Sequence, residues 1–177
     1  GDIIMPKICV QPGHINIQYN TDIALRSGTG APGEQELTLR VANRLSEILR
    51  QKGFYVQQTD ANANSDPNII GQDWDFFIAC HGDANVYGMG GGCISAPDPS
   101  VDASNTESKR IVQCLVDQYF PNSGIVNHPE RISKDMIYYY MWNVLTAKTP
   151  CGLIECGVVQ DPHDKVILAD TDRVCNA

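Results

Sequence analysis

The chain has 177 residues, of which 42% are hydrophobic and 19% are charged, and this is typical of one globular domain with a sizeable core. Thirteen Lys and Arg against 21 Asp and Glu give a net charge of −8, which argues against a nucleic-acid-binding protein and against attraction to anionic membranes. No apolar run approaches the ~20 residues of a membrane-spanning helix.

The cysteines and the start of the chain bear on the compartment. There are seven cysteines and no CxxC pair, so a cysteine zinc site has no support. Those in predicted buried strands (Cys9, Cys80, Cys151 and Cys156) are expected to act as small apolar residues, so we expect a reducing compartment, with one disulfide left open as an alternative. Residues 1–4 precede Met5 and lack the features of a signal peptide; we interpret them as a cloning remnant.

In the first half of the chain, an apolar run predicts a strand over residues 7–11 that Pro12-Gly13 ends. A long polar loop over 14–32 is of the kind that usually serves function. Apolar residues at helical spacing then predict a helix from Glu34 to about residue 52, ended by Gly53. That buried stripe consists of Leu37, Val41, Leu45, Ile48 and Leu49.

The remaining elements alternate between strands and helices. We predict strands over 54–59, 74–80, 91–96, 124–126 and 151–155, helices over 104–120 and 162–169, loops over 60–73, 81–92 and 122–131, and mixed structure over 135–144. Ser104 and Glu107 are spaced as a capping box, and Ile111, Cys114, Leu115 and Tyr119 are expected to face inward. This order predicts an α/β fold: one domain over 1–177, with a mostly parallel twisted sheet and helices on both faces.

Three side chains that can bind a metal stand at the ends of predicted elements. His14 follows the first strand, Glu34 opens the first helix, and His81 follows the apolar run 76–80. Ligands of open α/β sheets bind at the carboxyl ends of the strands, and two imidazoles with one carboxylate form a catalytic zinc site that keeps a position open. Alternatively, each histidine is a solvated loop residue and Glu34 only favours the helix dipole. Glu36 is a rival ligand, but it points about 200° away around the helix.

Glu155 is the other residue that could take part in catalysis. It ends the buried apolar strand 151–155 and precedes Cys156-Gly157. Burial raises the pKa of a carboxyl group, and a raised pKa suits proton transfer near neutral pH. The alternative is a structural ion pair with Arg or Lys.

With these residues in view, the chain resembles the zinc-dependent N-acetylmuramoyl-L-alanine amidases called amidase 3, found in phage endolysins, autolysins and cell-separation amidases. That family runs strand–DPGHG, a helix-opening Glu, strand–SxHxNA, and a late PxxLxExGFxxNxxD. The matching stretches here are Gln11-Pro12-Gly13-His14, Gly33-Glu34, Cys80-His81-Gly82-Asp83-Ala84, and Pro150 to Gly157 continuing to Asp164. The resemblance spans nearly the whole chain, and its four motifs occur in the family's order.

The resemblance implies a set of roles. His14, Glu34 and His81 would be ligands of Zn²⁺, and Glu155 would be catalytic. The chain departs from the motifs at Gln11 for Asp, Asp83 for Asn, Val158 for Phe and Asp161 for Asn. None of these departures removes a ligand or the catalytic glutamate, so they put substrate contacts in doubt rather than the metal.

The substrate implied is peptidoglycan, cleaved between N-acetylmuramic acid and L-alanine of the stem peptide. Loops 15–32, 82–92 and 121–135 are expected to form the walls of an open groove. The aromatic cluster Tyr138, Tyr139, Tyr140 and Trp142 would stack on substrate or pack in the core, two alternatives left open. His128, near Arg131, is either a substrate contact or a plain loop residue, and His163 is expected to be inert.

The resemblance also leads to expectations about the regulation, origin and place of synthesis of the protein. Some relatives insert an inhibitory helix before the catalytic glutamate; residues 96–104 are too few for one, so we expect a constitutively open site. We expect a phage endolysin catalytic domain, made in the bacterial host cytoplasm without a signal peptide, acting on the cell wall as a monomer, with a wall-binding domain missing after residue 177. The alternatives are a non-catalytic peptidoglycan-binding module and a zinc peptidase or deacetylase acting on another amide.

Overall fold

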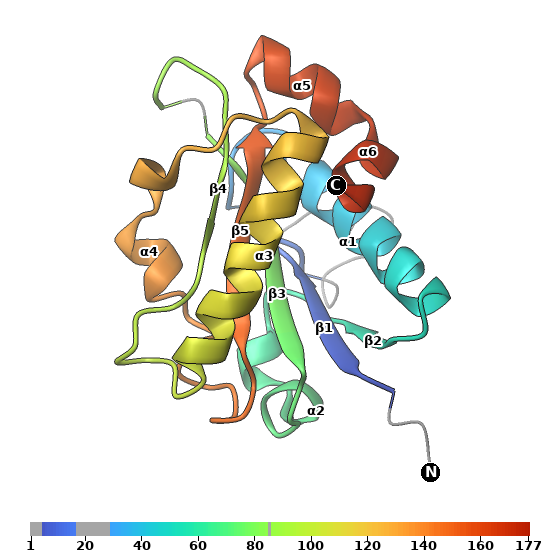
Figure 1. Ribbon diagram of the computed structural model, residues 1–177, viewed down its shortest axis with the longest axis vertical. Helices are drawn as coiled ribbons and strands as arrows, with labels where there is room; N and C mark the ends of the chain where they lie inside the picture. The colour runs from blue at the N-terminus through green and yellow to red at the C-terminus, as the bar shows by residue number, and fades with distance from the viewer. Residues whose placement is uncertain (1–4, 17–28, 85) are drawn as a thin grey trace.

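The computed structural model describes residues 5–16, 29–84 and 86–177, and at its centre is a five-stranded sheet in the order β2-β1-β3-β5-β4 (Figure 1). Four strands run parallel, and β4 pairs antiparallel with β5 at one edge. The strands are β1 (Lys7–Pro12), β2 (Tyr55–Gln58), β3 (Phe76–Asp83), β4 (Cys93–Ser95) and β5 (Cys151–Val158). The predicted α/β fold with a mostly parallel sheet is therefore confirmed.

Both faces of the sheet are covered, but unequally. One face packs against α1 (Glu34–Gln51), α3 (Asn105–Ser123), α5 (Pro162–Ala169) and α6 (Thr171–Asn176). The other face packs against η2 (Ala63–Ser65), α2 (Pro67–Ile70), α4 (Lys134–Ile137) and the irregular chain that follows α4, while η3 (Pro129–Arg131) contacts β4. The second face is thus covered by short elements. Loops with polar groups therefore lie near the carboxyl ends of the strands.

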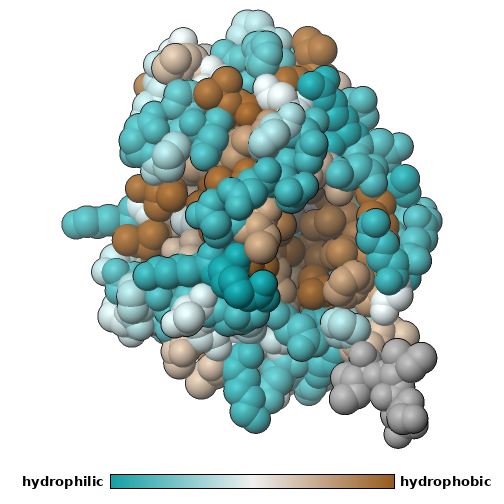
Figure 2. Space-filling model, in the orientation of Figure 1, coloured by the Kyte–Doolittle hydropathy of each residue, from teal (hydrophilic) through white to brown (hydrophobic). Residues whose placement is uncertain are grey.

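The helix α1 is amphipathic, as its spacing predicts. Leu37, Val41 and Ile48 are buried, and Leu45 and Leu49 pack partly buried against the same core. On this face, Figure 2 shows a hydrophobic hollow, and the apolar pocket between α1, α3 and α6 is lined by Leu45, Leu115 and Val174 among others. In the part of the chain that the structure describes, no helix has the length and apolar character needed to cross a bilayer.

Two strands run further than the sequence pattern indicates. β3 continues to Asp83 and β5 to Val158, so His81 lies within a strand rather than after it, and Glu155 lies inside a strand rather than at its end. The apolar pattern of the sequence stops at these polar residues. Both strands lie inside the sheet, where pairing with neighbours satisfies the backbone whatever the side chain: His81 pairs with Glu155, and Cys93 of β4 pairs with Glu155 from the other side.

The expected capping box at the start of α3 does not form. The hydroxyl of Ser104 donates to the carbonyl of Ala147, and Glu107 pairs with Arg110 instead. Asp102 takes over at this helix start, because its carboxylate accepts hydrogen bonds from the Ser104 N–H and the Ser108 hydroxyl.

Other local predictions also differ from the structure. The strand expected over 124–126 is replaced by a single bridge between Gly92 and Asn127, α3 runs on to Ser123, and Cys114 is exposed rather than inward-facing. The predicted loop 60–73 holds η2 and α2, and α6 was not predicted at all. The predictions for residues 1–4 and most of loop 15–32 fall outside the described residues. All seven cysteines are free, and the four expected to be buried are buried.

Candidate active site and metal centre

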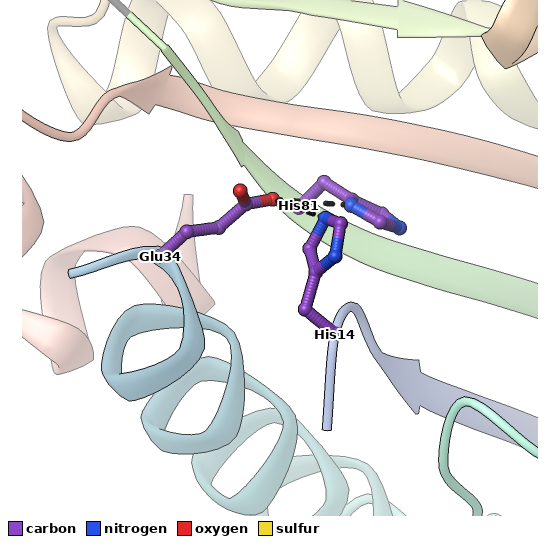
Figure 3. Close-up of side chains that lie close together, drawn as sticks. All are labelled: His14, Glu34 and His81. Atoms are coloured by element: carbon purple, nitrogen blue, oxygen red, sulfur yellow. Dashed lines mark hydrogen bonds and ion pairs between the residues drawn. The ribbon is translucent and has the colours of Figure 1, made fainter. Parts of the chain in front are cut away.

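Three side chains from separate elements converge at the carboxyl edge of the sheet (Figure 3). His14 lies just after β1, Glu34 is the first residue of α1, and His81 lies near the end of β3. Glu34 Oε1 is 3.2 Å from His14 Nε2 and 3.2 Å from His81 Nδ1. One ligand atom from each residue lies within 4.8 Å of the others, so the group could hold a metal ion. The structure therefore brings together the three residues that the sequence singles out.

The backbone around this group is shaped to permit the convergence. His14 has a φ of 61°, in the left-handed region that side chains rarely adopt, and such strain is typical of functional sites. Gly13 lies against the His81 ring, because a Cβ built there would be only 2.4 Å from His81 Cε1. Gly30, at φ +92°, lies as close to Glu34 and His14, where an added Cβ would be 2.9 Å from both side chains. Larger residues at these two glycines would push the histidines and the carboxylate apart.

Glu34 is buried and firmly held. Its Oε2 accepts a hydrogen bond from the Ala31 N–H at 2.8 Å, and its Oε1 accepts one from the Gly82 N–H at 3.2 Å. Glu36, the rival in the same turn, is exposed and faces away, in line with the helical geometry. The start of α1 thus presents Glu34 alone to the two histidines.

The donor set of this group suits a metal ion. Two imidazole nitrogens and one carboxylate oxygen face a common point, and these are ligands that zinc accepts. The nitrogen of each ring that faces away also has a partner: His14 Nδ1 lies 2.8 Å from Thr29 Oγ1, and His81 Nε2 lies 3.2 Å from the Tyr139 hydroxyl. Metal-binding histidines are commonly oriented in this way through their second nitrogen.

The charges at the site also favour a bound cation. Burial opposes ionisation of Glu34, but hydrogen bonds with His14 and His81 outweigh it and lower the pKa of Glu34 to about 2. Burial lowers the pKa of His81, against the opposing influence of Glu34, so its ring is neutral at pH 7. An ionised carboxylate beside a neutral, buried imidazole is the protonation state that metal ligands need.

Glu155 lies on the strand beside His81, on the same level of the sheet. Its Oε2 is buried and, among the residues that the structure describes, has no hydrogen-bond partner; nor does Glu155 form an ion pair with any described Arg or Lys, the structural alternative. Burial raises the pKa of Glu155 well above its usual value, and the neighbouring carboxylates of Glu34 and Asp83 raise it further. This is the environment of a carboxyl group able to exchange a proton near neutral pH.

The structure separates the aromatic cluster that the sequence analysis left undivided. Trp142 is buried in the core against Phe77, with ring centroids 6.2 Å apart, whereas Tyr138 and Tyr140 are exposed. Tyr139 packs edge-on against His81, with centroids 5.5 Å apart. Sequence reasoning grouped these residues by composition and could not identify Tyr139 as a neighbour of His81, since the two are 58 positions apart.

Gln11 is the second neighbour that sequence reasoning missed. It was noted only as a departure from the family motif, yet it is fully buried and its side chain accepts a hydrogen bond from Tyr139. The alternation of side chains along β1 offered a signal, because Gln11 shares a face of the sheet with Cys9, which packs in the core on the side of Tyr139.

The remaining candidates lie on the loops beside the site. His128 pairs with Glu130 and packs on Gly91. Arg131 is buried, its guanidinium lies 4.3 Å from the centre of the Tyr87 ring, and its Nη1 has no hydrogen-bond partner within residues 5–16, 29–84 and 86–177. No contact in the described residues assigns either side chain to the three-residue group.

A second group with metal-binding atoms, Asp161, His163 and Asp164, lies at the start of α5. Its carboxylates already have structural partners. Asp164 Oδ2 accepts hydrogen bonds from the N–H groups of Gly91 and Val158, at 2.6 Å and 2.9 Å, and Asp161 caps α5. Asp164 therefore ties the glycine-rich loop to the end of β5, which is a structural role.

Comparison with known proteins agrees with this arrangement. Residues 8–175 match the model of the Amidase_3 family, described as N-acetylmuramoyl-L-alanine amidase. No curated protein matches the chain.

Solved structures share the fold at low sequence identity. The amidase Ami1 from Mycobacterium smegmatis is similar with a TM-score of 0.73 and 16% identity, over 97% of this chain and 92% of that one. The amidase AmiC2 of Nostoc punctiforme has a TM-score of 0.66 and 16% identity, over 97% and 91%. The catalytic domain of the CD27L endolysin, which targets Clostridia difficile, has a TM-score of 0.64 and 13% identity, over 96% and 92%. On the family match over almost its entire length, the chain belongs to the Amidase_3 family of N-acetylmuramoyl-L-alanine amidases.

Proposed function

We propose that this amidase hydrolyses the amide bond between N-acetylmuramic acid and L-alanine in peptidoglycan with one zinc ion held by His14, Glu34 and His81, and with Glu155 as the catalytic acid and base. The observation that carries the proposal is the convergence of the two imidazole nitrogens on Glu34 Oε1, with Glu155 paired to His81 on the adjacent strand. Three protein ligands leave a position open, as catalytic zinc sites do.

Each residue has a distinct task in this scheme. A bound zinc would polarise the scissile carbonyl and lower the pKa of a water molecule. Glu155 takes the proton of the attacking water and then gives it to the departing amine of L-alanine. Its burial supports both steps, because a raised pKa lets the same carboxyl group accept and donate a proton near pH 7.

An exposed aromatic residue beside the site favours a large substrate. Tyr140 packs against Tyr139 and presents its ring to solvent, and such a ring can stack on sugar or peptide. Glycine-rich residues 86–92 and the segment 124–131 would form two walls of the substrate groove; the third expected wall, over 17–28, lies outside the described residues. We further propose a role in phage lysis, with synthesis in the host cytoplasm; one of the structural neighbours is an endolysin catalytic domain.

The test is product analysis with defined metal content. The protein is stripped with a chelator, returned to zinc, and incubated with purified muropeptides. We expect zinc-dependent release of peptides with a free N-terminal L-alanine. Wall sedimentation without release would favour the non-catalytic binding module, and cleavage of another amide would favour a peptidase or deacetylase.

Replacement of the catalytic glutamate separates catalysis from metal binding. Glu155→Gln is expected to abolish turnover while zinc stays bound, because Glu155 is not one of the three converging ligands. Full activity of Glu155→Gln would exclude Glu155 as the acid and base.

A further inference from the structure

A chain of hydrogen bonds leads away from the metal group through Tyr139 and Gln11. His81 Nε2 lies 3.2 Å from the Tyr139 hydroxyl, and that hydroxyl donates to Gln11 Oε1 at 3.1 Å. Gln11 Nε2 in turn donates to the backbone carbonyl of Asp60 at 2.8 Å and to the Tyr140 hydroxyl at 3.0 Å. This hydrogen-bond network therefore joins His81 on β3 to the backbone just after β2.

The direction of every hydrogen bond in this network follows from the group at its far end, the backbone carbonyl of Asp60. The carbonyl of Asp60 can only accept, so the Gln11 atom that faces it is the amide nitrogen, and the amide oxygen faces Tyr139. That oxygen can also only accept, so Tyr139 must donate its single proton to Gln11. His81 Nε2 also faces the Tyr139 oxygen, so it must carry the proton that this bond needs.

Tyr140 does not disturb this order. Its hydroxyl proton goes to the carbonyl of Ala61 at 2.8 Å, so its oxygen is free to accept from Gln11. Both protons of the Gln11 amide are thus used, and the amide has no alternative orientation that satisfies the same partners. Gln11 is fully buried and Tyr139 is partly buried, which makes an unpaired group in this hydrogen-bond network costly.

We infer that Tyr139 and Gln11 are positioning residues that hold His81, once a metal is bound, in the tautomer with the proton on Nε2, so that the lone pair of Nδ1 faces the metal position. The inference rests on the proposed zinc site and deepens it. A neutral imidazole binds a metal through its unprotonated nitrogen, and the bond made by the other nitrogen decides which one that is. The family motif has aspartate at position 11; a carboxylate could not donate to the Asp60 carbonyl, so glutamine suits this arrangement.

The experiment measures zinc affinity, by competition with a chromophoric chelator, for the wild type and for Tyr139→Phe. The substitution removes the hydroxyl and keeps the ring against His81. Loss of an outer hydrogen bond of this kind typically costs 10–100-fold in metal affinity, and we expect a rise of roughly that size in Kd. Tyr138→Phe is the matched control: it removes a hydroxyl from an exposed neighbour, and its Kd should stay at the wild-type value.

A double-mutant cycle distinguishes the hydrogen-bond network through Tyr139 and Gln11 from a general effect on packing. Gln11→Leu should weaken zinc binding through the loss of the Tyr139 orientation, so adding it to Tyr139→Phe should cost little more. Unfolding curves of the zinc-free variants establish that each is folded. Zinc affinity of Tyr139→Phe equal to the wild type, or full additivity of the two substitutions, would overturn the inference. A wild type that binds no zinc would instead overturn the proposed function.

Discussion

Replacing Glu155 by glutamine should stabilise the zinc-free protein at neutral pH. The substitution keeps the shape of the side chain and removes its charge. In the folded protein the charged form is disfavoured by burial first and then by the carboxylates of Glu34 and Asp83, and no described residue donates a hydrogen bond to Oε2 to offset this. The native glutamate therefore carries a stability cost that glutamine does not share, a trade of stability for activity.

The sign and pH range of the effect follow from the raised pKa. Below the ordinary value of 4.5, Glu155 is protonated in both the folded and the unfolded chain, and its charge costs nothing. As pH rises above 4.5, the unfolded chain loses its proton first, so the wild type loses stability until pH passes the raised pKa of the folded state. The advantage of Glu155→Gln should appear across this interval and be small below pH 4.5.

The expected size follows from linkage: each pKa unit by which folding raises Glu155 corresponds to about 1.4 kcal/mol at a pH above the raised value. In a chain of this length, each kcal/mol shifts Tm by roughly 2–4 °C. Thermal unfolding of both zinc-free proteins from pH 4 to pH 8 measures the difference directly. Amide hydrolysis by the zinc-loaded variant should meanwhile fall by at least ~100-fold. A variant that is less stable than the wild type at pH 7, or equally more stable at every pH, would refute the reasoning.

Three further substitutions test the site and its frame. Gly13→Ala should displace the His81 ring, because the added Cβ would lie 2.4 Å from Cε1, and zinc affinity by chelator competition should fall while the exposed substitution Glu36→Gln leaves it unchanged. Glu34→Gln should abolish zinc retention in metal analysis, since it removes the charge between the two histidines; retention of a full equivalent would count against Glu34 as a ligand. Asp164→Asn weakens the acceptor for the Gly91 and Val158 N–H groups and should lower the free energy of unfolding by about 1–3 kcal/mol in urea titration, without changing the zinc Kd.

The core of the fold could be predicted from local patterns. The apolar runs gave β1, β3 and β5, and the helical spacing of Leu37 and Val41 gave α1, because burial on a face imposes a period that the sequence must follow. Short elements were missed because they contain too few residues for such a period to be detected. In α6 only Val174 is buried, and the helix is held by its Asp170 cap and by packing on α1.

The candidate site also divides into residues that local sequence signals identify and residues that only the fold brings together. His14, Glu34 and His81 could be singled out because each stands next to a strong local signal: a Pro-Gly stop, a helix start and an apolar run. Tyr139 and Gln11 could not be assigned a role, since their hydrogen bond joins residues 128 positions apart and exists only once the chain has folded. The ends of β3 and β5 were placed too early for a related reason: pairing between strands overrides the polarity of His81 and Glu155.

The central claim is that one metal ion lies among His14, Glu34 and His81, and anomalous scattering tests it most directly. Crystals of the zinc-loaded protein should give a single strong peak at the zinc absorption edge, within bonding distance of His14 Nε2, Glu34 Oε1 and His81 Nδ1. No peak at that position, or a peak only at the Asp161, His163 and Asp164 group, would contradict the account.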